Sequence, residues 1–456
     1  MLPKQSVPPR LARQVAQELY QHMVLYGYDL IELPIIEPAD LFLIKAGDQA
    51  IGKLFTFEQH GRQRALRPEF TAAAAYRYVQ LNSSGVVRWQ FGGQIFEDDP
   101  NDSSRDYQRL SIGAELIGLS GTAADAEIIS MAARGLDRIG IHSWRVTIGL
   151  TRLMRQILSR FGLDSRMERF VLNHLPALAD PHKGKPFVLE QLDRFLLGSS
   201  VFTQSDEINP ANMLETLLDV LSRTQTMGGR THQEIARRLA QKRQHVVERP
   251  QIVHALNELE RWNTINHSPT EAFKIMDSLI APDDTASRQT LAEWKQTVQL
   301  LQAYQIPEEN LSLRPNLART WAYYTGIVFE LTADGRHVGG GGRYDELARL
   351  LGSRRDVPAV GFAYYADHIL DLLPSETYAG PFSVTISSTP ENALAAAVWA
   401  DRLREQHIPV CLMPPEQAQN GSPLLVVDEQ QRISFGAEVF TLSDINRLVS
   451  LLGNQP

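Results

Sequence analysis

The sequence predicts a protein that mixes strands and helices, on three observations. Residues 324–331 have an apolar strand pattern, and four consecutive glycines and then a helical periodicity over 343–351 follow them. Residues 165–305 are rich in Leu, Arg, Gln and Glu at helical spacing, which indicates a helical insertion. Residues 382–452 alternate short strand and helix patterns, which indicates a small α/β domain.

The composition is that of a globular protein with more than one domain. A chain of 456 residues, 43% of them hydrophobic, is long enough for two or three domains with a substantial core. Its 45 Lys and Arg against 53 Asp and Glu give a formal net charge of −8. A protein whose main task is to grip nucleic acid is more often basic, although a local basic patch is compatible with an acidic total.

The cysteine and histidine content excludes several kinds of site. Cys411 is the only cysteine, so the chain can form neither an intrachain disulfide nor a cysteine-based zinc site. The twelve histidines include no pair at metal-ligand helical spacing. The N-terminus lacks the apolar core of a secretory signal, and no run of about 18 apolar residues predicts a membrane span. We therefore expect a cytoplasmic protein with no metal, no cofactor and no membrane segment.

The four consecutive glycines predict a built site. They lie between a strand pattern and an amphipathic helix, where a flexible linker, the alternative explanation, is seldom found. Glycine adopts backbone angles closed to other residues and lets a ligand approach the main chain, at a cost in conformational entropy. We expect Gly340, Gly341, Gly342 and Arg343 to form a glycine platform at a ligand site, or the relic of one.

Two motifs in this region resemble the active-site core of histidyl-tRNA synthetases. The first is YYTG followed by I-V-F-E over residues 323–330, and the second is GGGRYD over 340–345. The resemblance implies the class II synthetase fold, an α+β architecture in which an antiparallel sheet is flanked by helices. The implied organisation is a class II core of residues 1–164 and 306–373, a helical insertion of 165–305, and a small α/β domain of 381–456.

The helical insertion and the last domain are the two segments that could bind tRNA. Histidyl-tRNA synthetases contact the tRNA acceptor stem with a helical insertion near this place, and residues 381–456 resemble a shortened form of their anticodon-binding domain. Acidic residues interleave the basic ones in this insertion, so a solvated helical cap is an equally good interpretation. The last segment has no cluster of basic and aromatic residues. We therefore expect no tRNA binding.

The start of the chain resembles the dimer-forming first motif of class II synthetases. Residues 11–25 have the spacing of an amphipathic helix, and residues 28–36 have the pattern of a strand that ends near Pro34. Proline suits an edge or an interface, because it cannot donate to a central ladder. The resemblance implies a homodimer, although the proline alone fits any edge strand.

The amino-acid half of the family's active site is retained in pieces. Glu69 and Thr71 match residues that help to hold the amino acid's ammonium group, although Phe70 replaces the glycine between them. Arg319 matches the arginine that stabilises charge as the amino acid attacks ATP. The resemblance implies a histidine-binding set, with core packing as the alternative role of its two tyrosines: Glu69, Thr71, Glu115, Arg319, Tyr323 and Tyr324.

The ATP half departs from the family at three positions. Glu97 stands where the enzymes have the arginine that binds the α-phosphate, and a carboxylate repels a phosphate. Tyr365 stands at the glycine that leaves room for adenine, so its ring fills that space. His368 replaces the arginine that grips the γ-phosphate, and neutral histidine cannot supply that permanent cation. We predict a lost ATP site at Glu97, Tyr365 and His368, and no catalytic residue.

This combination is similar to one group of synthetase paralogues, the regulatory subunits of ATP phosphoribosyltransferase. These proteins cannot charge tRNA, and they complete and regulate a short catalytic subunit that opens histidine biosynthesis. The segment IGAELIG over 112–118, followed by DAEII over 125–129, is more similar to them than to the enzymes. We predict a non-catalytic regulatory subunit that partners the short-form catalytic subunit as a homodimer within a hetero-oligomer, with histidine as a candidate ligand.

Two alternatives stay open at this point. An active histidyl-tRNA synthetase, or a synthetase-like ligase for another substrate, would bind ATP and catalyse ATP-pyrophosphate exchange. An assembly scaffold with a relic pocket would bind no small molecule.

Overall fold

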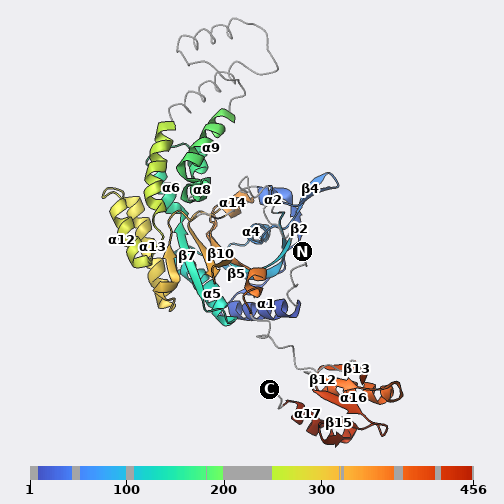
Figure 1. Ribbon diagram of the computed structural model, residues 1–456. Coiled ribbons are helices and arrows are strands. Elements are labelled where there is room, and N and C mark those ends of the chain that lie inside the picture. Colours follow the sequence, from blue (N-terminus) through green and yellow to red (C-terminus); the bar gives the residue numbers. More distant parts are fainter. Residues whose placement is uncertain are drawn as a thin grey trace, which may run out of the picture. The chain divides into compact units, whose positions relative to one another are not determined.

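The computed structural model describes nine stretches of the chain, which divide between two compact units (Figure 1). The larger unit holds Ala12–Leu372, and the smaller holds Leu373–Pro456 together with Pro8–Leu11. The described residues are 9–43, 52–98, 107–180, 182–198, 249–317, 319, 323–373, 384–415 and 423–453.

The larger unit is built on one eight-stranded sheet, in the order β1-β5-β6-β11-β10-β9-β7-β8. The strands from β5 to β7 in this order pair antiparallel with one another, and the two edge strands pair in parallel. The predicted antiparallel sheet is thereby confirmed. In chain order the strands are β1 (Asp29–Leu30), β5 (Val87–Phe96), β6 (Gln108–Ile117), β7 (Trp144–Leu150), β8 (Leu311–Leu313), β9 (Ile327–Ala333), β10 (Arg336–Arg343) and β11 (Ala359–Tyr365).

The register of the central strands aligns the residues that the family motifs singled out. Glu115 of β6 pairs with Gly361 of β11, Gly361 pairs with Gly342 of β10, and Gly342 pairs with Val328 of β9. Paired residues on neighbouring strands point to the same face of a sheet. One row across four strands therefore carries a carboxylate beside two glycines.

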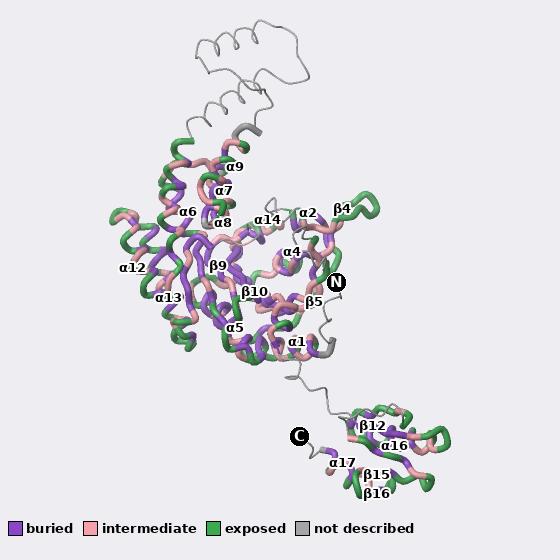
Figure 2. Tube along the Cα trace, in the orientation of Figure 1, coloured by how far each residue is buried: buried purple, intermediate pink, exposed green. Residues whose placement is uncertain are grey.

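Helices flank this sheet. The helix α5 (Thr122–Arg138) packs against strands of the sheet on one side and against α13 (Thr285–Ala303) on the other, so most of its residues are buried. The central strands β9 and β10 are buried, whereas the hairpin at β4 is exposed (Figure 2). The other helices of the core are α1 (Pro9–Val24), α2 (Ala39–Leu43), α4 (Thr71–Gln80), α6 (Thr151–Ser159), η1 (Glu308–Asn310), α14 (Leu347–Leu350) and α15 (Ala366–Leu370).

A second, three-stranded sheet precedes α4. It has the order β2-β4-β3, with β2 (Ile36–Pro38), β3 (Thr56–Gln59) and β4 (Arg62–Leu66). His60 and Gly61 join β3 to β4 with φ angles of 51° and 71°, the left-handed pair that matches the twist of a two-residue hairpin.

The described part of the predicted insertion is helical. Asp164 caps α7 by accepting from the backbone N–H groups of Arg166 and Met167. Because α13 packs on α5 and α6, the last part of this region belongs physically to the core. Residues 199–248 lie outside the described part, and the domain boundaries stay predictions. The helices are α7 (Ser165–Asn173), α8 (Leu175–Ala179), α9 (Gly184–Gly198), residues 249–263, α12 (Pro269–Leu279) and α13.

The smaller unit is a five-stranded sheet in the order β13-β12-β14-β15-β16. Its first three strands are parallel and the last two are antiparallel. One core cluster joins Trp399 and Leu448 of its helices to the strands. The elements are β12 (Val384–Ser387), η2 (Pro390–Asn392), α16 (Ala393–Glu405), β13 (Val410–Met413), β14 (Leu424–Val427), β15 (Ile433–Phe435), β16 (Glu438–Phe440), η4 (Leu442–Asp444) and α17 (Ile445–Gly453).

Two local predictions are wrong. The single strand expected over 28–36 is two short strands, β1 and β2, because the chain leaves the ladder before Pro34, which has no N–H to donate. The helix expected over 343–351 is reduced to α14, because Arg343 ends strand β10 and the next two residues are held by contacts to other elements.

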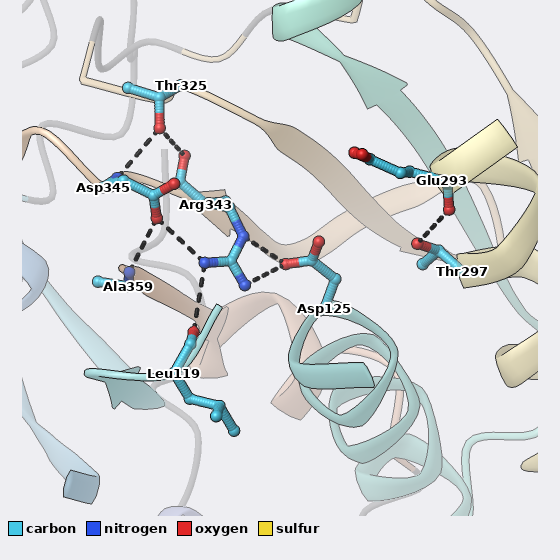
Figure 3. Close-up of polar contacts among 8 residues, drawn as sticks. All are labelled: Leu119, Asp125, Glu293, Thr297, Thr325, Arg343, Asp345 and Ala359. Carbon is cyan, nitrogen blue, oxygen red and sulfur yellow. Dashed lines mark hydrogen bonds and ion pairs between the residues drawn. The ribbon is translucent and has the colours of Figure 1, made fainter. Parts of the chain in front are cut away.

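A buried ion cluster fixes the end of β10 (Figure 3). The Arg343 guanidinium donates from Nε to Asp125 Oδ1 at 2.8 Å and from Nη1 to Asp345 Oδ1 at 3.0 Å. It also donates to the carbonyl of Leu119 at 3.4 Å, and Asp345 Oδ1 accepts from the backbone N–H of Ala359 at 2.9 Å. Buried charges are tolerated when they are paired in this way. The cluster thus ties β10 to the first turn of α5 and to the start of β11.

Replacing Asp125 with Asn should destabilise the larger unit. Arg343 would keep Asp345 but would lose the charge of its second partner in a site where its side chain is 8% exposed. We expect a loss of about 2–4 kcal/mol in the free energy of unfolding, measured by urea denaturation. Asp356→Asn is the control, because the Arg349–Asp356 ion pair is about half exposed and should contribute less than about 1 kcal/mol. Equal effects of the two variants would contradict the structural role of the cluster.

Candidate functional site

The acidic end of the site is built at the start of α4. Glu69 precedes this helix, and its carboxylate accepts from the backbone N–H groups of Thr71 at 2.5 Å and Ala72 at 2.8 Å. These N–H groups are among those that a helix N-terminus leaves without an intrahelical partner, so Glu69 is held in a fixed position. The Thr71 hydroxyl donates to Glu115 Oε1 at 2.6 Å, which joins the helix to β6.

Glu115 lies at the centre of the sheet. Its side chain is fully buried, and the Tyr344 hydroxyl donates to its second oxygen, Oε2, at 2.5 Å. Its strand neighbour Gly361 gives it room, since a Cβ on that glycine would collide with the Glu115 carboxylate. Sequence reasoning missed Tyr344, although the GGGRYD motif contains it directly after Arg343.

Three carboxylates gather at this end, and the buried ones resist ionisation. Burial raises the pKa of Glu69 to about 7, while hydrogen bonds from Ala72 and Thr71 lower it and the charge of Glu97 adds to the increase. Burial raises the pKa of Glu115 to about 8, and the charge of Glu69 adds to that shift. An anion is therefore disfavoured here, and a bound cation would relieve the repulsion.

Phe70 has a packing role in place of the family's glycine. Its ring is buried, stacks on Phe91 with centroids 4.4 Å apart, and lies under the Arg67 guanidinium at 3.9 Å. Arg67 in turn donates to the carbonyls of Leu33 at 2.7 Å and Gln94 at 2.8 Å. The arginine that precedes Glu69 is therefore occupied in holding backbone segments together.

An aromatic wall continues from the acidic end. The rings of Tyr323 and Tyr324 lie 4.8 Å apart, and the Tyr323 and Tyr344 rings lie 5.9 Å apart. Burial raises the pKa of Tyr323 well above its usual value, and the charge of Glu69 contributes, which places this tyrosine beside the carboxylates. Burial raises the pKa of Tyr324 to about 12, and the nearby charge of Arg319 opposes this shift.

Arg319 forms the basic end. Its Nη1 donates to the Phe329 carbonyl at 3.1 Å, and its Nη2 donates to the Tyr365 hydroxyl at 3.3 Å. The guanidinium rests against Gly340, where a Cβ would collide with Nη1. The site thus has a carboxylate end and a guanidinium end with tyrosines between them.

The glycines belong to strand β10, where we expected a platform for a ligand. Gly341 meets the backbone of Gly361 and Phe362 on the next strand so closely that a Cβ would collide with it. A Cβ on Gly342 would lie 2.9 Å from the Tyr324 ring. Their described role is to let neighbouring strands and side chains approach the main chain. A direct contact between these glycines and a ligand stays a prediction.

The three residues of the predicted lost ATP site lie on different elements and have different contacts. Tyr365 ends β11, and its ring lies edge-on to His337 at 5.2 Å and beside His368 at 5.6 Å. His368 Nδ1 lies 2.7 Å from the His337 carbonyl oxygen. Glu97 follows β5, and its backbone N–H donates to the Tyr107 carbonyl at 3.1 Å. Sequence reasoning missed His337, which no motif marked.

The described residues offer neither a metal cluster nor a membrane-spanning helix. That part of the chain contains no group of three or more His, Cys, Asp or Glu residues placed to hold a metal ion. It also contains no helix that is long and apolar enough to span a membrane.

The fold and the site define a class II synthetase-like protein. The family model for histidyl-tRNA synthetase matches residues 2–182 and 207–369. The chain therefore belongs to the histidyl-tRNA synthetase family.

The chain is also similar to individual relatives and to a solved structure. The ATP phosphoribosyltransferase regulatory subunit of Sinorhizobium fredii is 28% identical over 354 residues, which are 74% of this chain and 91% of the relative. The protein of the same name from Agrobacterium fabrum is 27% identical over 368 residues, 78% of this chain and 96% of the relative. A crystal structure of an ATP phosphoribosyltransferase regulatory subunit/histidyl-tRNA synthetase from Bacillus halodurans matches with a TM-score of 0.61 at 20% identity and covers 91% of this chain and 92% of that one. This last likeness supports the fold alone.

Replacing Glu115 with Gln tests the buried carboxyl. The pKa of Glu115 rises from an ordinary 4.5 to about 8 in the fold, so its contribution to stability is fully present below about pH 4.5 and is lost as the pH rises through about 8. The amide of Glu115→Gln stays neutral. We expect this variant to unfold at a higher temperature than wild type at about pH 9, and near the wild-type temperature at about pH 5.

A second glutamate provides the control for this experiment. Glu58 lies on the exposed strand β3, so Glu58→Gln should leave the unfolding temperature near that of wild type at both pH values. A Glu115→Gln variant that is less stable than wild type at about pH 9 would show that the ionised carboxylate stabilises the fold, and it would contradict the raised pKa of Glu115.

Proposed function

We propose that this chain is a non-catalytic regulatory subunit of ATP phosphoribosyltransferase, which completes and regulates a short catalytic subunit at the start of histidine biosynthesis. The relatives from Sinorhizobium and Agrobacterium carry that name and are matched over most of their length. The observation that carries the proposal is the Arg319–Tyr365 contact, because it ties the retained arginine to a residue that replaces the nucleotide-binding glycine.

The chemistry of the site argues against activation of an amino acid. Attack on ATP requires cations placed around the transferring phosphorus, and stabilising that charge is most of the catalysis. The three positions that the resemblance assigns to ATP hold a carboxylate, a phenol and an imidazole, at Glu97, Tyr365 and His368. The Tyr365 ring contacts His337 and His368, and its hydroxyl contacts Arg319.

The amino-acid half of the family's active site suits a free amino acid, and we propose that its ligand is histidine. An ammonium group would bind at Glu69, Thr71 and Glu115, where it would relieve the repulsion between buried carboxylates. A carboxylate would bind at Arg319, and the tyrosine wall would line the side chain. A pathway regulator that binds the amino acid at the end of its pathway would give feedback on the catalytic subunit.

An exposed apolar patch supports the proposed homodimer. Val24 and Leu25 at the end of α1 are 58% and 80% exposed, and Leu30 on the edge strand β1 is 57% exposed. A hollow of about 440 Å³ beside this patch is lined by residues of α1, β1 and β5, among them Tyr20 and Gln90. Contiguous apolar surface at a sheet edge marks an interaction site. A monomeric mass by light scattering would contradict the dimer.

Assembly with the catalytic subunit is the first test. Co-expression with a short-form ATP phosphoribosyltransferase from the same genome should give one co-eluting complex, and phosphoribosyl transfer to ATP should be strongly reduced when this chain is left out. The catalytic subunit alone is the control. Separate elution, with full activity of the catalytic subunit alone, would refute the regulatory role.

Ligand binding is the second test. In calorimetry we expect histidine to bind and ATP-magnesium not to bind, and Glu69→Gln should weaken histidine at least about 10-fold because a charge-assisted hydrogen bond is lost. Glu58→Gln, on the exposed hairpin, should bind as wild type does. Tight ATP binding with ATP-pyrophosphate exchange would instead support a ligase. No binding of either ligand would support a scaffold with a relic pocket.

A further inference from the structure

Tyr365 holds Arg319 in place from the side where the enzymes have an open space. The Tyr365 hydroxyl accepts from Arg319 Nη2 at 3.3 Å, and the Phe329 carbonyl accepts from Nη1 at 3.1 Å. A guanidinium has five N–H donors in one plane, and these two bonds use two of them. The plane of the arginine is therefore set by β9 on one side and by the end of β11 on the other.

Tyr365 is itself supported. Its ring contacts two histidines, with centroids 5.2 Å from His337 and 5.6 Å from His368. His368 is placed by its contact with the His337 carbonyl. The next helix, α15, is tied to β6 because Asp367 Oδ2 accepts from the backbone N–H of Leu110 at 2.9 Å. A tyrosine that merely filled space would need none of these contacts to its hydroxyl and its ring.

We propose that Tyr365 is a positioning residue that makes this site specific for an amino acid with a free carboxylate. Its hydroxyl orients the Arg319 guanidinium for two-point binding of a carboxylate, and its ring occupies the space that any group attached to that carboxylate would need. The substitution that removes the nucleotide site thus also completes the amino-acid site. This inference rests on the proposed amino-acid pocket and adds the feature that excludes adenylated, esterified or amidated ligands.

Two ligands that differ only in the carboxylate test the orienting role. Calorimetry with the full chain would compare histidine with histidinol, which keeps the ammonium group and the imidazole but has no carboxylate. Tyr365→Phe keeps the ring and removes the hydroxyl, so we expect about 5- to 10-fold weaker histidine binding and unchanged histidinol binding. Tyr304→Phe, at an exposed tyrosine beyond α13, should change neither affinity.

Several outcomes would overturn the orienting role. Equal losses for histidine and histidinol in Tyr365→Phe would show a general structural role, and no loss for either would show that the hydroxyl does nothing. A wild-type chain that does not bind histidine would end this proposal together with the amino-acid pocket. The regulatory assembly would be unaffected by that result, because co-elution with the catalytic subunit measures it separately.

A third ligand tests the exclusion of larger groups. The sulfamoyl analogue of histidyl-adenylate should not bind to wild type or to Tyr365→Phe, whereas Tyr365→Gly, which opens the space, should bind it measurably. Tyr365→Ala serves the same purpose if the glycine variant does not fold. Binding of the analogue by wild type, or no gain in either opened variant, would overturn the exclusion.

Discussion

The close approach of the main chain in the middle of the large sheet is the constraint on which the site depends. Glycines stand at the points where a Cβ would collide with a site residue, with Gly361 against Glu115 and Gly340 against Arg319. Gly341 of β10 lies where a Cβ would collide with the Gly361 carbonyl of the paired strand β11. A carboxylate and a guanidinium can therefore lie against the same sheet without displacing its strands.

Around this centre the site is polarised. Glu69 and Glu115 share Thr71 at one end, and their burial makes ionisation costly. Arg319 lies at the other end, beyond the tyrosines, and its guanidinium is held by a carbonyl and a phenol rather than by a carboxylate. An arrangement with separated acidic and basic ends matches a zwitterion, whereas a polyphosphate would meet the carboxylates.

The departures from the family are physically connected. Phe70 packs between Arg67 and Phe91, which gives the arginine before Glu69 a purely structural task. Tyr365 replaces a glycine of the family motif, and its hydroxyl accepts from Arg319. Each of these two replacements thus contacts an arginine that lies in a family motif.

The sequence by itself determined the family, the antiparallel sheet and most elements of the core, because these follow from local patterns and from motifs of adjacent residues. The amphipathic helix expected over 11–25, the strand pattern over 324–331 and the alternation of strands and helices over 382–452 belong to this group. It also marked Glu69, Glu115 and Arg319 through the family motifs, but it did not single out Tyr344. The sequence pattern did not predict which of these residues contact one another.

Only the tertiary structure decided which residues touch. Tyr344 reaches Glu115 across 229 positions of the chain, and Arg343 reaches Asp125 across 218, so neither partner can be read from spacing. The four glycines predicted a ligand platform between a strand and a helix. They form part of strand β10, because ladder bonds on both sides outweigh the weak strand preference of glycine. Tyr365 likewise forms its hydrogen bond with a residue 46 positions away, because the fold and not the spacing brings strand β11 beside Arg319.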